Sequence, residues 1–300
     1  MDTQSRSQPK SQQLCVIVTT FNRCHITERF LLSLRAELKN SQLPARVYVV
    51  DDASVDGTKE MIKSKFPEVE LLHGNGHLYW AGGVRMALKF IGSGINSYRG
   101  ILLANDDIVF ANNSIADLVE LSEKHTALVG GTVVTYGGQI ESSGSVLGRI
   151  CKPKPKLKIA NGSPQNCDLL PGHLMYIPIE IFEKLDGFDD NLPFRFIDLE
   201  FSLRAKRMGF PVLLAPEVVA YTDEVHDYFK ETSAMRGTLS QLVEDILLHP
   251  KGPHWRESAY YLRKVSPFLW WLWLPFFYRA FFVAVFKSFL GRISFWGNSR

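Results

Sequence analysis

The chain has 300 residues, of which 46% are hydrophobic and 22% are charged, and its formal net charge at pH 7 is +3. These are the values of a globular protein that can hold one large α/β domain or two modest ones. So mild a charge gives no reason to expect a nucleic-acid partner, and the four cysteines lack the CxxC spacing and density of a disulfide scaffold, so a reducing cytosol fits best.

The first 13 residues are polar and lack the apolar stretch that a secretory signal needs, so a disordered tail is expected over residues 1–13. From residue 14 to about 134, short apolar runs alternate with segments whose apolar residues recur every three to four positions. The runs are typical of buried strands, and the recurring segments are typical of amphipathic helices. The expected strands cover residues 14–19, 46–50, 69–72, 100–104 and 127–134. Ser54 and Ser114 are expected to cap two of the helices.

This alternation predicts a mostly parallel sheet flanked by helices. In such sheets, ligands bind beyond the carboxyl ends of the strands. Polar residues gather at these ends in four places, at residues 20–22, 51–52, 74–75 and 105–107. Their recurrence predicts a binding site along this edge of the sheet.

The pattern loosens between residues 137 and 167, where a basic, proline-broken segment at 151–158 is expected to form a loop. Regularity returns with an expected strand at 169–177, a helix near 179–185 and a helix over 198–208. No internal repeat is visible.

Asn105-Asp106-Asp107 follows a strongly apolar strand and is the first candidate site. Two carboxylates at a strand end suit a hard cation such as Mg²⁺ or Mn²⁺, which takes waters and phosphate oxygens as its remaining ligands. An ordinary turn is the alternative, because Asn and Asp favour turns, but the other polar strand ends favour the metal site. His226 is a further candidate metal ligand through its imidazole, with a structural histidine as the alternative.

Two more strand ends offer groups to a nucleotide. Asp51 closes the expected second strand, where its carboxylate can accept from a base imide or from ribose hydroxyls. The glycine-rich stretch from Gly74 to Gly83 leads into an expected helix, and a helix N-terminus offers unpaired N–H groups to an anion such as a diphosphate. An ordinary glycine-rich turn is the alternative there.

Asp198 and Glu200 stand at the start of an expected helix, at a spacing that points them to different faces. Asp198 lies among apolar residues, which raise the pKa of a carboxyl group, whereas a helix N-terminus lowers it. It is therefore a candidate general base for a sugar hydroxyl, with helix capping as the alternative. Glu200 can instead pair with Arg204 at i, i+4.

Together these blocks resemble the family 2 glycosyltransferases, which are inverting enzymes with the A-type glycosyltransferase fold. The matching segments are residues 18–23, 49–58, 75–83, 102–107, 187–189 and 198–205. Each motif is loose alone, but their order and spacing are specific, and the resemblance spans about residues 14–240. The GNGHLYWAGG form of residues 74–83 is most similar to bacterial rhamnosyl- and related cell-surface-polysaccharide transferases.

The resemblance implies a role for each matching residue. It makes Asp107 the main ligand of Mg²⁺ or Mn²⁺ and makes Asp198, six residues before Arg204, the base. The family's glutamate before the base is replaced by Ile197, and Arg85 stands where relatives often carry Asn. The implied donor-binding residues are Thr20, Phe21, Asn22, Arg23, Asp51, Asn75, Gly82, Gly83 and Asp106. The implied acceptor-binding residues are Gly172 and Glu200.

The resemblance also implies an organisation and partners. It predicts a catalytic domain over residues 14–240, with a nucleotide-binding half at about 14–135 and an acceptor half at about 136–240. A helical, membrane-associating region follows at 241–300. The expected partners are a dTDP- or UDP-linked sugar and a glycan or polyprenyl-diphosphate-linked acceptor in cell-surface polysaccharide synthesis.

Residues 268–286 are apolar and carry a single charge, Arg279. At about 1.5 Å per residue, a helix of this length approaches the ~30 Å hydrocarbon core of a bilayer. Its tryptophans fit an interfacial belt, and the basic residues after it suit anionic headgroups. Pro275 and Arg279 argue against a clean span, so an interfacial helical hairpin is the alternative. The expected location is the cytoplasmic face of the inner (plasma) membrane.

Two other functions are open. A sugar-nucleotide pyrophosphorylase shares nucleotide-sugar binding, but it should carry a glycine-rich phosphate loop after the first strand, and residues 20–24 contain no glycine. A non-catalytic nucleotide-sugar-binding subunit is the second alternative, which the presence of both Asp107 and Asp198 disfavours. A dehydrogenase is disfavoured because no GxGxxG motif follows the first strand.

Overall fold

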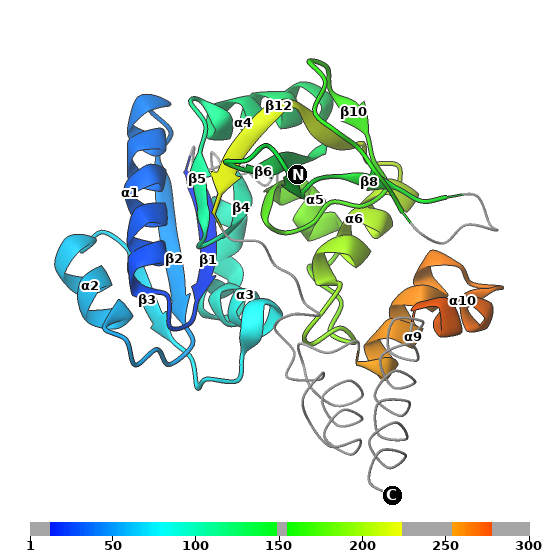
Figure 1. The fold of residues 1–300 in the computed structure, drawn as a ribbon, viewed down its shortest axis with the longest axis horizontal. Coiled ribbons are helices and arrows are strands. Elements are labelled where there is room, and N and C mark those ends of the chain that lie inside the picture. The colour runs from blue at the N-terminus through cyan, green and yellow to red at the C-terminus, as the bar shows by residue number, and fades with distance from the viewer. Residues whose placement is uncertain (1–12, 149–154, 224–253, 278–300) are drawn as a thin grey trace, which may run out of the picture. The chain divides into compact units, whose positions relative to one another are not determined.

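The computed structural model describes residues 13–148, 155–223 and 254–277, which are coloured in Figure 1. These residues fall into two compact units. The larger unit holds residues 13–148, 155–189 and 197–223, and the smaller unit holds residues 190–196 and 254–277. Residues 1–12 of the tail expected over residues 1–13, and residues 151–154 of the loop expected at 151–158, lie outside the described residues.

Ten strands of the larger unit form one mixed sheet. They are β1 (Leu14–Thr20), β2 (Ala45–Asp51), β3 (Glu70–His73), β4 (Gly100–Asn105), β5 (Ile108–Phe110), β6 (Leu128–Thr135), β7 (Ile140–Ser142), β10 (Gln165–Asn166), β11 (Leu174–Pro178) and β12 (Val212–Thr222). The order along the sheet is β10-β12-β6-β11-β4-β1-β2-β3, while β5 pairs with β12 and β7 pairs with β6. A second sheet consists of β8 (Ser145–Val146) and β9 (Lys156–Leu157).

The predicted α/β sheet flanked by helices is confirmed, with its first four strands parallel as expected, but the sheet as a whole is mixed. β3, β2, β1 and β4 run parallel to one another, as do β6 and β12. β11 is antiparallel to both of its neighbours, β4 and β6. The sequence pattern predicted neither β5 nor β12. Pro216 interrupts β12, and the strand accommodates it at a register irregularity between Leu214 and Val218, which hides the strand from a search for an unbroken apolar run.

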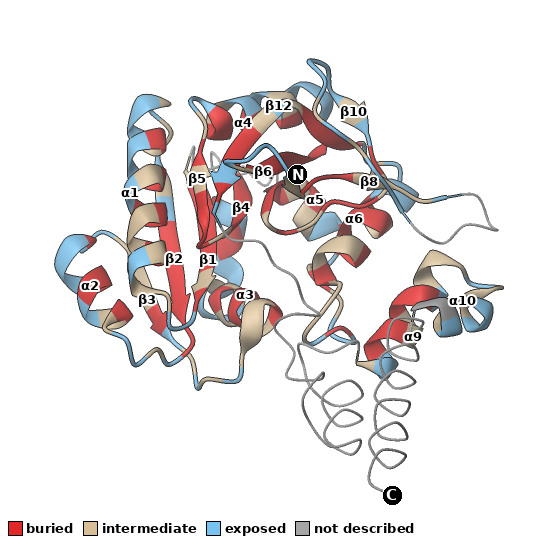
Figure 2. Cartoon of the chain, in the orientation of Figure 1, coloured by how far each residue is buried: buried red, intermediate tan, exposed pale blue. Residues whose placement is uncertain are grey.

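Helices cover both faces of this sheet. They are α1 (Cys24–Asn40), α2 (Thr58–Lys65), α3 (Tyr79–Ile91), η1 (Gly92–Ser97), α4 (Ser114–His125), α5 (Ile179–Lys184) and α6 (Ile197–Arg207). Successive side chains of a strand point to opposite faces of the sheet, and two neighbouring residues of β1 show which helix covers each face. Val18 belongs to the buried core cluster that includes Phe30 of α1, whereas Thr19 points at Gly83 of α3. The core between these layers is drawn in red in Figure 2.

The expected cap at Ser54 is wrong. α2 begins after Gly57, whose φ of 88° places it in the left-handed region that glycine adopts readily, and the side chain that accepts from the first N–H of this helix, that of Thr58, belongs to Asp56, at 3.2 Å. Ser54 Oγ instead accepts a hydrogen bond from the backbone N–H of Asn22 at 2.8 Å. Ser54 therefore joins two loops rather than starting a helix.

The expected cap at Ser114 is also wrong. Ser114 is the first residue of α4, and its Oγ donates to the carbonyl of Val219 at 2.7 Å. The N–H groups of Asn113 and Ile115 donate to the buried carboxylate of Glu37, at 3.2 and 3.1 Å. A carboxylate from α1 thus stabilises the start of α4.

The later predictions are partly confirmed. α5 and α6 lie within one residue of the expected starts of the helices at 179–185 and 198–208. The expected strand at 169–177 is shorter, because β11 begins only at Leu174. The segment between residues 137 and 167 holds short strands, one of which, β9, lies inside the loop expected at 151–158.

The smaller unit consists of α9 (Trp255–Val265), α10 (Trp270–Phe277) and residues 190–196. Buried Glu257 of α9 accepts from the backbone N–H groups of Phe194 and Arg195, at 3.2 and 2.8 Å. Phe196 stacks on Tyr261 with ring centroids 4.6 Å apart. Among the described residues, no helix is long and apolar enough to cross a membrane, and residues 278–286 of the expected membrane segment lie beyond them.

Candidate active site

Three strands end side by side at the edge where the sequence predicts a binding site. In register, Thr20 of β1 lies opposite Asp51 of β2, and Thr19 lies opposite Asn105 of β4. Because Asp106 and Asp107 directly follow β4, they stand beside the loop that follows β1. The predicted gathering of polar residues at this edge is therefore confirmed.

Asp106 and Asp107 are both buried and share one cation supplied by the chain. Arg23, in the loop between β1 and α1, donates from Nη1 to Asp106 Oδ1 at 3.2 Å and to Asp107 Oδ2 at 2.9 Å. The guanidinium stays protonated at any physiological pH, so both contacts are ion pairs. The motif resemblance placed Arg23 on the donor side of the site but did not reveal its contact with the predicted metal ligands.

Asp106 is held by hydroxyl groups as well as by Arg23. Its Oδ2 accepts from Thr27 Oγ1 at 3.1 Å, and this hydroxyl lies 2.7 Å from Thr20 Oγ1. Burial raises the pKa of Asp106, the Arg23 guanidinium lowers it, and the carboxylate of Asp107 raises it again. The net direction is upward, because removal from water disfavours the charged form. Thr20 is itself buried, with its hydroxyl inside this network.

The backbone of Asp107 is fixed from another part of the sheet. Thr222 Oγ1, at the end of β12, donates to the carbonyl of Asp107 at 2.9 Å. In the pairing of β12 with β5, Thr222 lies opposite Ile108. The late strand β12 therefore helps to position the predicted metal ligand, a contribution that the early motifs could not show.

Asn22 ties the loop after β1 to the loop after β2. Its Oδ1 accepts from the N–H of Val55 at 2.9 Å, and its own N–H donates to Ser54 Oγ. Its φ of 52° lies in the left-handed region, which Asn adopts more readily than most residues. Phe21 beside it is 48% exposed. Asn22 thus has a structural role, and its contact with a nucleoside, like that of Phe21, stays a prediction.

Asp51 and Asp52 are both buried at the end of β2, but the sequence suggested a role only for Asp51. The carboxylate of Asp52 accepts from the N–H groups of Gly76, Leu78 and Tyr79, at 2.8, 2.8 and 3.1 Å. These groups surround the start of α3. The expectation that this helix start offers unpaired N–H groups to a diphosphate is therefore wrong for these three, because the chain supplies its own anion.

Gly82 and Gly83 lie within α3 rather than before it. A Cβ on Gly83 would come within 2.5 Å of Thr19 Cγ2, so this glycine allows α3 to pack closely on β1. Asn75 is exposed, and its Oδ1 accepts from the N–H of His77 at 3.0 Å. Donor binding by these three residues stays a prediction.

Asp198 is held at the start of α6 by two backbone N–H groups. Gly172 donates to Oδ2 at 2.6 Å, and Leu199 donates to Oδ1 at 2.9 Å. Burial raises the pKa of Asp198, and these hydrogen bonds offset only part of that effect. A Cβ on Gly172 would lie 2.3 Å from Cη2 of Trp80, so the absence of a side chain lets the indole of α3 reach this point beside Asp198. Trp80 is a neighbour of the candidate base that the sequence did not identify.

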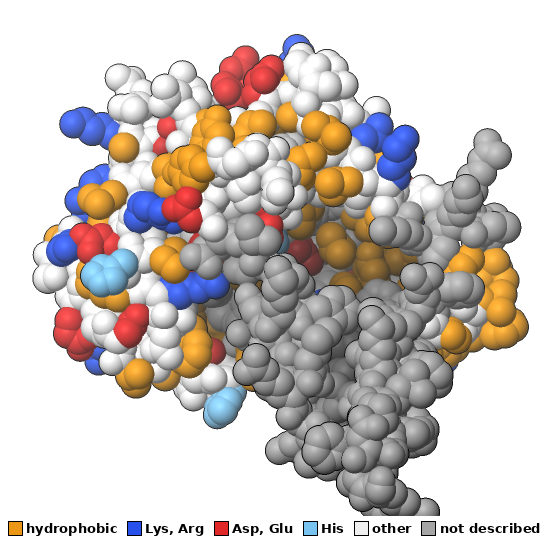
Figure 3. Space-filling model, in the orientation of Figure 1, with side chains coloured by type: hydrophobic (Ala, Val, Ile, Leu, Met, Phe, Trp, Pro, Cys, Tyr) orange, Lys and Arg blue, Asp and Glu red, His pale blue; other side chains and the backbone are white. Residues whose placement is uncertain are grey.

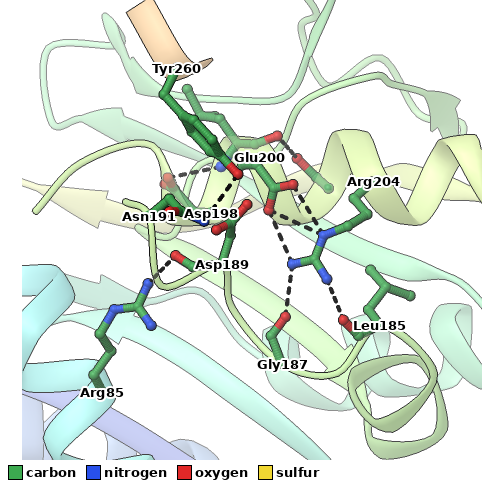
Figure 4. Close-up of polar contacts among 11 residues, drawn as sticks. Arg85, Leu185, Gly187, Asp189, Asn191, Asp198, Glu200, Arg204 and Tyr260 are labelled. Atoms are coloured by element: carbon green, nitrogen blue, oxygen red, sulfur yellow. Dashed lines mark hydrogen bonds and ion pairs between the residues drawn. The ribbon is translucent and has the colours of Figure 1, made fainter. Parts of the chain in front are cut away.

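The acceptor contact expected for Glu200 is not supported. Glu200 is 1% exposed, and its oxygens accept from Nε and Nη2 of Arg204, each at 3.1 Å. Arg204 also donates to the carbonyls of Gly187, at 2.8 Å, and Leu185 (Figure 4). The i, i+4 pairing is therefore the correct alternative, and it ties α6 to the loop after α5.

Arg85 is a departure from the family pattern. Its Nη2 donates to the carbonyl of Asp189 at 2.5 Å, as Figure 4 shows. The side chain thus links α3 to the end of the segment that follows α5. This gives Arg85 a structural role in the larger unit.

The donors at the strand ends fit a hard divalent cation that arrives with phosphate. Asp107, with Asp106 beside it, supplies carboxylate oxygens, which Mg²⁺ and Mn²⁺ prefer. Among the described residues, no group of three or more His, Cys, Asp or Glu side chains is placed to hold an ion. His226 lies outside the described residues. The side chains of the described residues therefore fill only part of the coordination shell of a cation here.

Comparisons with known proteins identify the family and the fold. Residues 15–185 match the family described as Glycosyl transferase family 2. No curated protein matches the chain. A similar solved structure is that of GalNAc-T7 with UDP, GalNAc and Mn²⁺, with a TM-score of 0.56 and 14% identity, covering 85% of this chain and 51% of that one. The chain thus spans about half the length of GalNAc-T7.

A second similar structure is the mannosyltransferase PcManGT from Pyrobaculum calidifontis in complex with GDP-Man and Mn²⁺. Its TM-score is 0.54 at 15% identity, covering 96% of this chain and 76% of that one. At these identities the likeness concerns the fold, and it confirms the predicted A-type glycosyltransferase fold. The family match extends over more than half of the 300 residues of the chain, so the chain belongs to glycosyltransferase family 2.

Proposed function

We propose that this protein is an inverting, metal-dependent glycosyltransferase that moves a sugar from a nucleoside-diphosphate sugar to a hydroxyl of a glycan or lipid-linked acceptor. The observation that carries the proposal is the placement of Asp106 and Asp107 beside the end of β1, at the edge where β2 ends in Asp51. Family membership supports the reaction class.

The donor side rests on three carboxylates. We infer that Asp107 is the main ligand of Mg²⁺ or Mn²⁺, that Asp106 lies close to the donor ribose or sugar, and that Asp51 accepts from the base or ribose. When bound, the cation offsets the charge that develops on the leaving diphosphate. The GalNAc-T7 and PcManGT structures, which hold Mn²⁺ with UDP or GDP-Man, support a divalent cation and a nucleotide sugar as the bound molecules.

Asp198 serves as the base in this proposal. The acceptor oxygen forms a bond to the anomeric carbon while the bond from that carbon to the diphosphate oxygen breaks, and the diphosphate leaves with the electron pair. The acceptor proton passes to Asp198, whose carboxylate is oriented by the N–H groups of Gly172 and Leu199. One displacement from the opposite face inverts the anomeric centre.

The finer substrate assignment follows the sequence pattern. The form of residues 74–83 supports a dTDP- or UDP-linked rhamnose or hexose donor, and it favours a glycan or polyprenyl-diphosphate-linked acceptor in cell-surface polysaccharide synthesis. An acceptor with a lipid anchor requires the enzyme to work at a membrane surface. We therefore place the protein at the cytoplasmic face of the inner (plasma) membrane.

Exposed apolar side chains of the smaller unit support attachment to a membrane. Phe268 is 89% exposed, Trp271 58% and Leu272 40%. Figure 3 shows hydrophobic surface in the area where α10 lies in Figure 1. Arg263, whose guanidinium lies 4.2 Å from the centre of the Trp270 ring, adds positive charge beside these rings. Aromatic rings with adjacent basic groups suit the headgroup region of a bilayer.

A transfer assay tests the function. The protein is incubated with Mn²⁺ or Mg²⁺ and a panel of UDP-, dTDP- and GDP-linked sugars, and release of the nucleoside diphosphate is measured. We expect metal-dependent release from a subset of donors. In Asp198→Asn, which keeps a similar shape, release should fall by about 10²–10⁴-fold, with an unchanged circular-dichroism spectrum.

The two other functions predict different results. A non-catalytic subunit would show a nucleotide-sugar-induced rise in melting temperature without release of the diphosphate. A pyrophosphorylase would form a nucleotide sugar and pyrophosphate from a nucleoside triphosphate and a sugar phosphate. Normal activity in Asp198→Asn would rule out Asp198 as the base.

A further inference from the structure

We propose that Arg23 is a built-in counter-cation, which keeps a divalent metal from the Asp106–Asp107 pair until a nucleoside diphosphate arrives. Metal and nucleotide then enter the site together. This inference rests on the proposed function, because it concerns the order in which the ligands of that same site bind.

Arg23 is built into the site by its backbone as well as by its side chain. It is the last residue before α1, where its carbonyl accepts from the N–H of Thr27 at 2.8 Å. Its neighbour Asn22 is tied to the loop after β2. Its side chain is 29% exposed, whereas those of Asp106 and Asp107 are 7% and 3% exposed. The guanidinium therefore reaches inward to the carboxylates, while the side chain as a whole stays partly exposed.

The charges explain why metal alone should bind weakly. Two adjacent buried carboxylates repel each other, and the guanidinium compensates one of their charges. A divalent cation on Asp107 would have to stand beside this guanidinium, or displace it from Oδ2. Both changes oppose binding, because like charges repel strongly away from bulk water.

A diphosphate removes this obstacle. Guanidinium groups bind phosphate as well as carboxylate, through parallel N–H contacts. A diphosphate at the strand ends offers the partly exposed Arg23 an anionic partner besides the two carboxylates. It also brings the oxygen ligands that a cation on Asp107 needs, because the described residues do not supply a complete set.

The decisive experiment measures Mn²⁺ binding without nucleotide, by the loss of the free-Mn²⁺ signal in electron paramagnetic resonance. We expect Arg23→Gln to bind Mn²⁺ alone at least about tenfold more tightly than the unmodified protein. Adding Asp107→Asn to Arg23→Gln should abolish the gain, which assigns it to this site. Arg29→Gln is the matched control, because Arg29 lies on α1 and pairs with Asp223 where both side chains are well exposed. It should bind as the unmodified protein does.

A second measurement needs no variant. In the unmodified protein, Mn²⁺ alone should leave the melting temperature unchanged. Mn²⁺ added with UDP, dTDP or GDP should raise it further than that nucleotide alone does, for at least one of the three. A rise with Mn²⁺ alone that equals the rise with metal and nucleotide together would overturn the proposal.

The outcomes separate this inference from the proposed function. Equal affinity of Arg23→Gln and the unmodified protein for Mn²⁺ alone, including no binding by either, overturns the role of Arg23. The transferase function is judged independently, by metal-dependent release of diphosphate from a nucleotide sugar in the unmodified protein. The role of Arg23 can therefore fail while the transferase function holds.

Discussion

At the scale of single residues, burial sets the chemistry of Asp198. The carboxyl group is partly buried at the start of α6, which raises its pKa despite the two N–H groups that it accepts from. A base with a raised pKa holds a transferred proton more firmly, which suits proton transfer from a sugar hydroxyl. The same burial gives the activity a characteristic pH dependence.

We expect the acid limb of kcat/KM for transfer to lie above the ordinary aspartate pKa of about 3.9. Activity should fall as the pH drops through the raised pKa, because the protonated form cannot accept the acceptor proton. Asp198→Glu should move this limb, and an unmoved limb would assign it to another group.

The stability of the fold should depend on pH in the opposite direction from the activity, because the folded state holds the proton of Asp198 more firmly than the unfolded chain does. The contribution of Asp198 to the free energy of unfolding should fall as pH rises from the unfolded pKa to the raised folded pKa.

Gly172 is expected to tolerate no side chain. A Cβ at this position would lie 2.3 Å from the indole of Trp80, so Gly172→Ala should force Trp80 or Asp198 to move. We expect a loss of about 1–3 kcal/mol in the free energy of unfolding, with a lower kcat, measured by urea unfolding and transfer assays. Gly94→Ala is the control, because the nearest atom there is 3.9 Å away. If Trp80→Ala did not relieve the effect of Gly172→Ala, the clash would not be its cause.

The candidate site was predictable from the sequence where its residues sit at strand ends. Asp51, Asp106 and Asp107 follow apolar runs, and the parallel pairing of β1 with β2 and β4 brings them together. The partners supplied by distant segments were not predictable. Arg23 meets Asp107 across 84 positions of the chain, and such a contact exists only once the strands have been placed.

At the scale of elements, two helices start on carboxylates from elsewhere in the fold. Asp52 accepts from N–H groups at the start of α3, and Glu37 of α1 accepts from N–H groups at the start of α4. Sequence rules for caps look for a serine, threonine, asparagine or aspartate next to the helix. They selected Ser54 and Ser114 and missed both distant carboxylates.

We expect Asp52→Ala to destabilise the protein by about 1–3 kcal/mol, because three N–H groups lose a charged acceptor. The change should be measured by urea unfolding. Asp223→Ala, which removes an exposed ion pair with Arg29, is the control and should have an effect of about 0–1 kcal/mol. Equal losses in the two variants would mean that the contacts of Asp52 do not stabilise the start of α3.

The sheet was predictable in its first half and not in its second. The apolar runs of β1 to β4 are separated by helices, a pattern that specifies parallel neighbours. The second half depends on β11, which runs in the opposite direction, and on β12, which contains Pro216. Neither strand has the local pattern that identifies its neighbours in the sheet.

At the scale of the whole molecule, the described part of the smaller unit exposes a group of large apolar side chains on and beside α10. We expect the double variant Phe268→Ser/Trp271→Ser to bind vesicles containing anionic phospholipid at least about tenfold more weakly, because both side chains are well exposed. Flotation with liposomes measures this binding. Phe90→Ser, an exposed aromatic residue of α3 in the larger unit, is the control. If the double variant floated as well as the control, attachment through these residues would be wrong.

The antiparallel strand β11 has a consequence for folding during synthesis on the ribosome. β4 and β6 do not pair with each other, because β11 lies between them, and it comes from residues 174–178. Until this segment leaves the ribosomal exit tunnel, the inner edges of β4 and β6 have no partner. Open edges invite pairing with other chains. The nascent chain therefore passes through a period in which these two edges are exposed to aggregation, which ends for them when β11 is inserted, and a chaperone that covers strand edges would act during that interval.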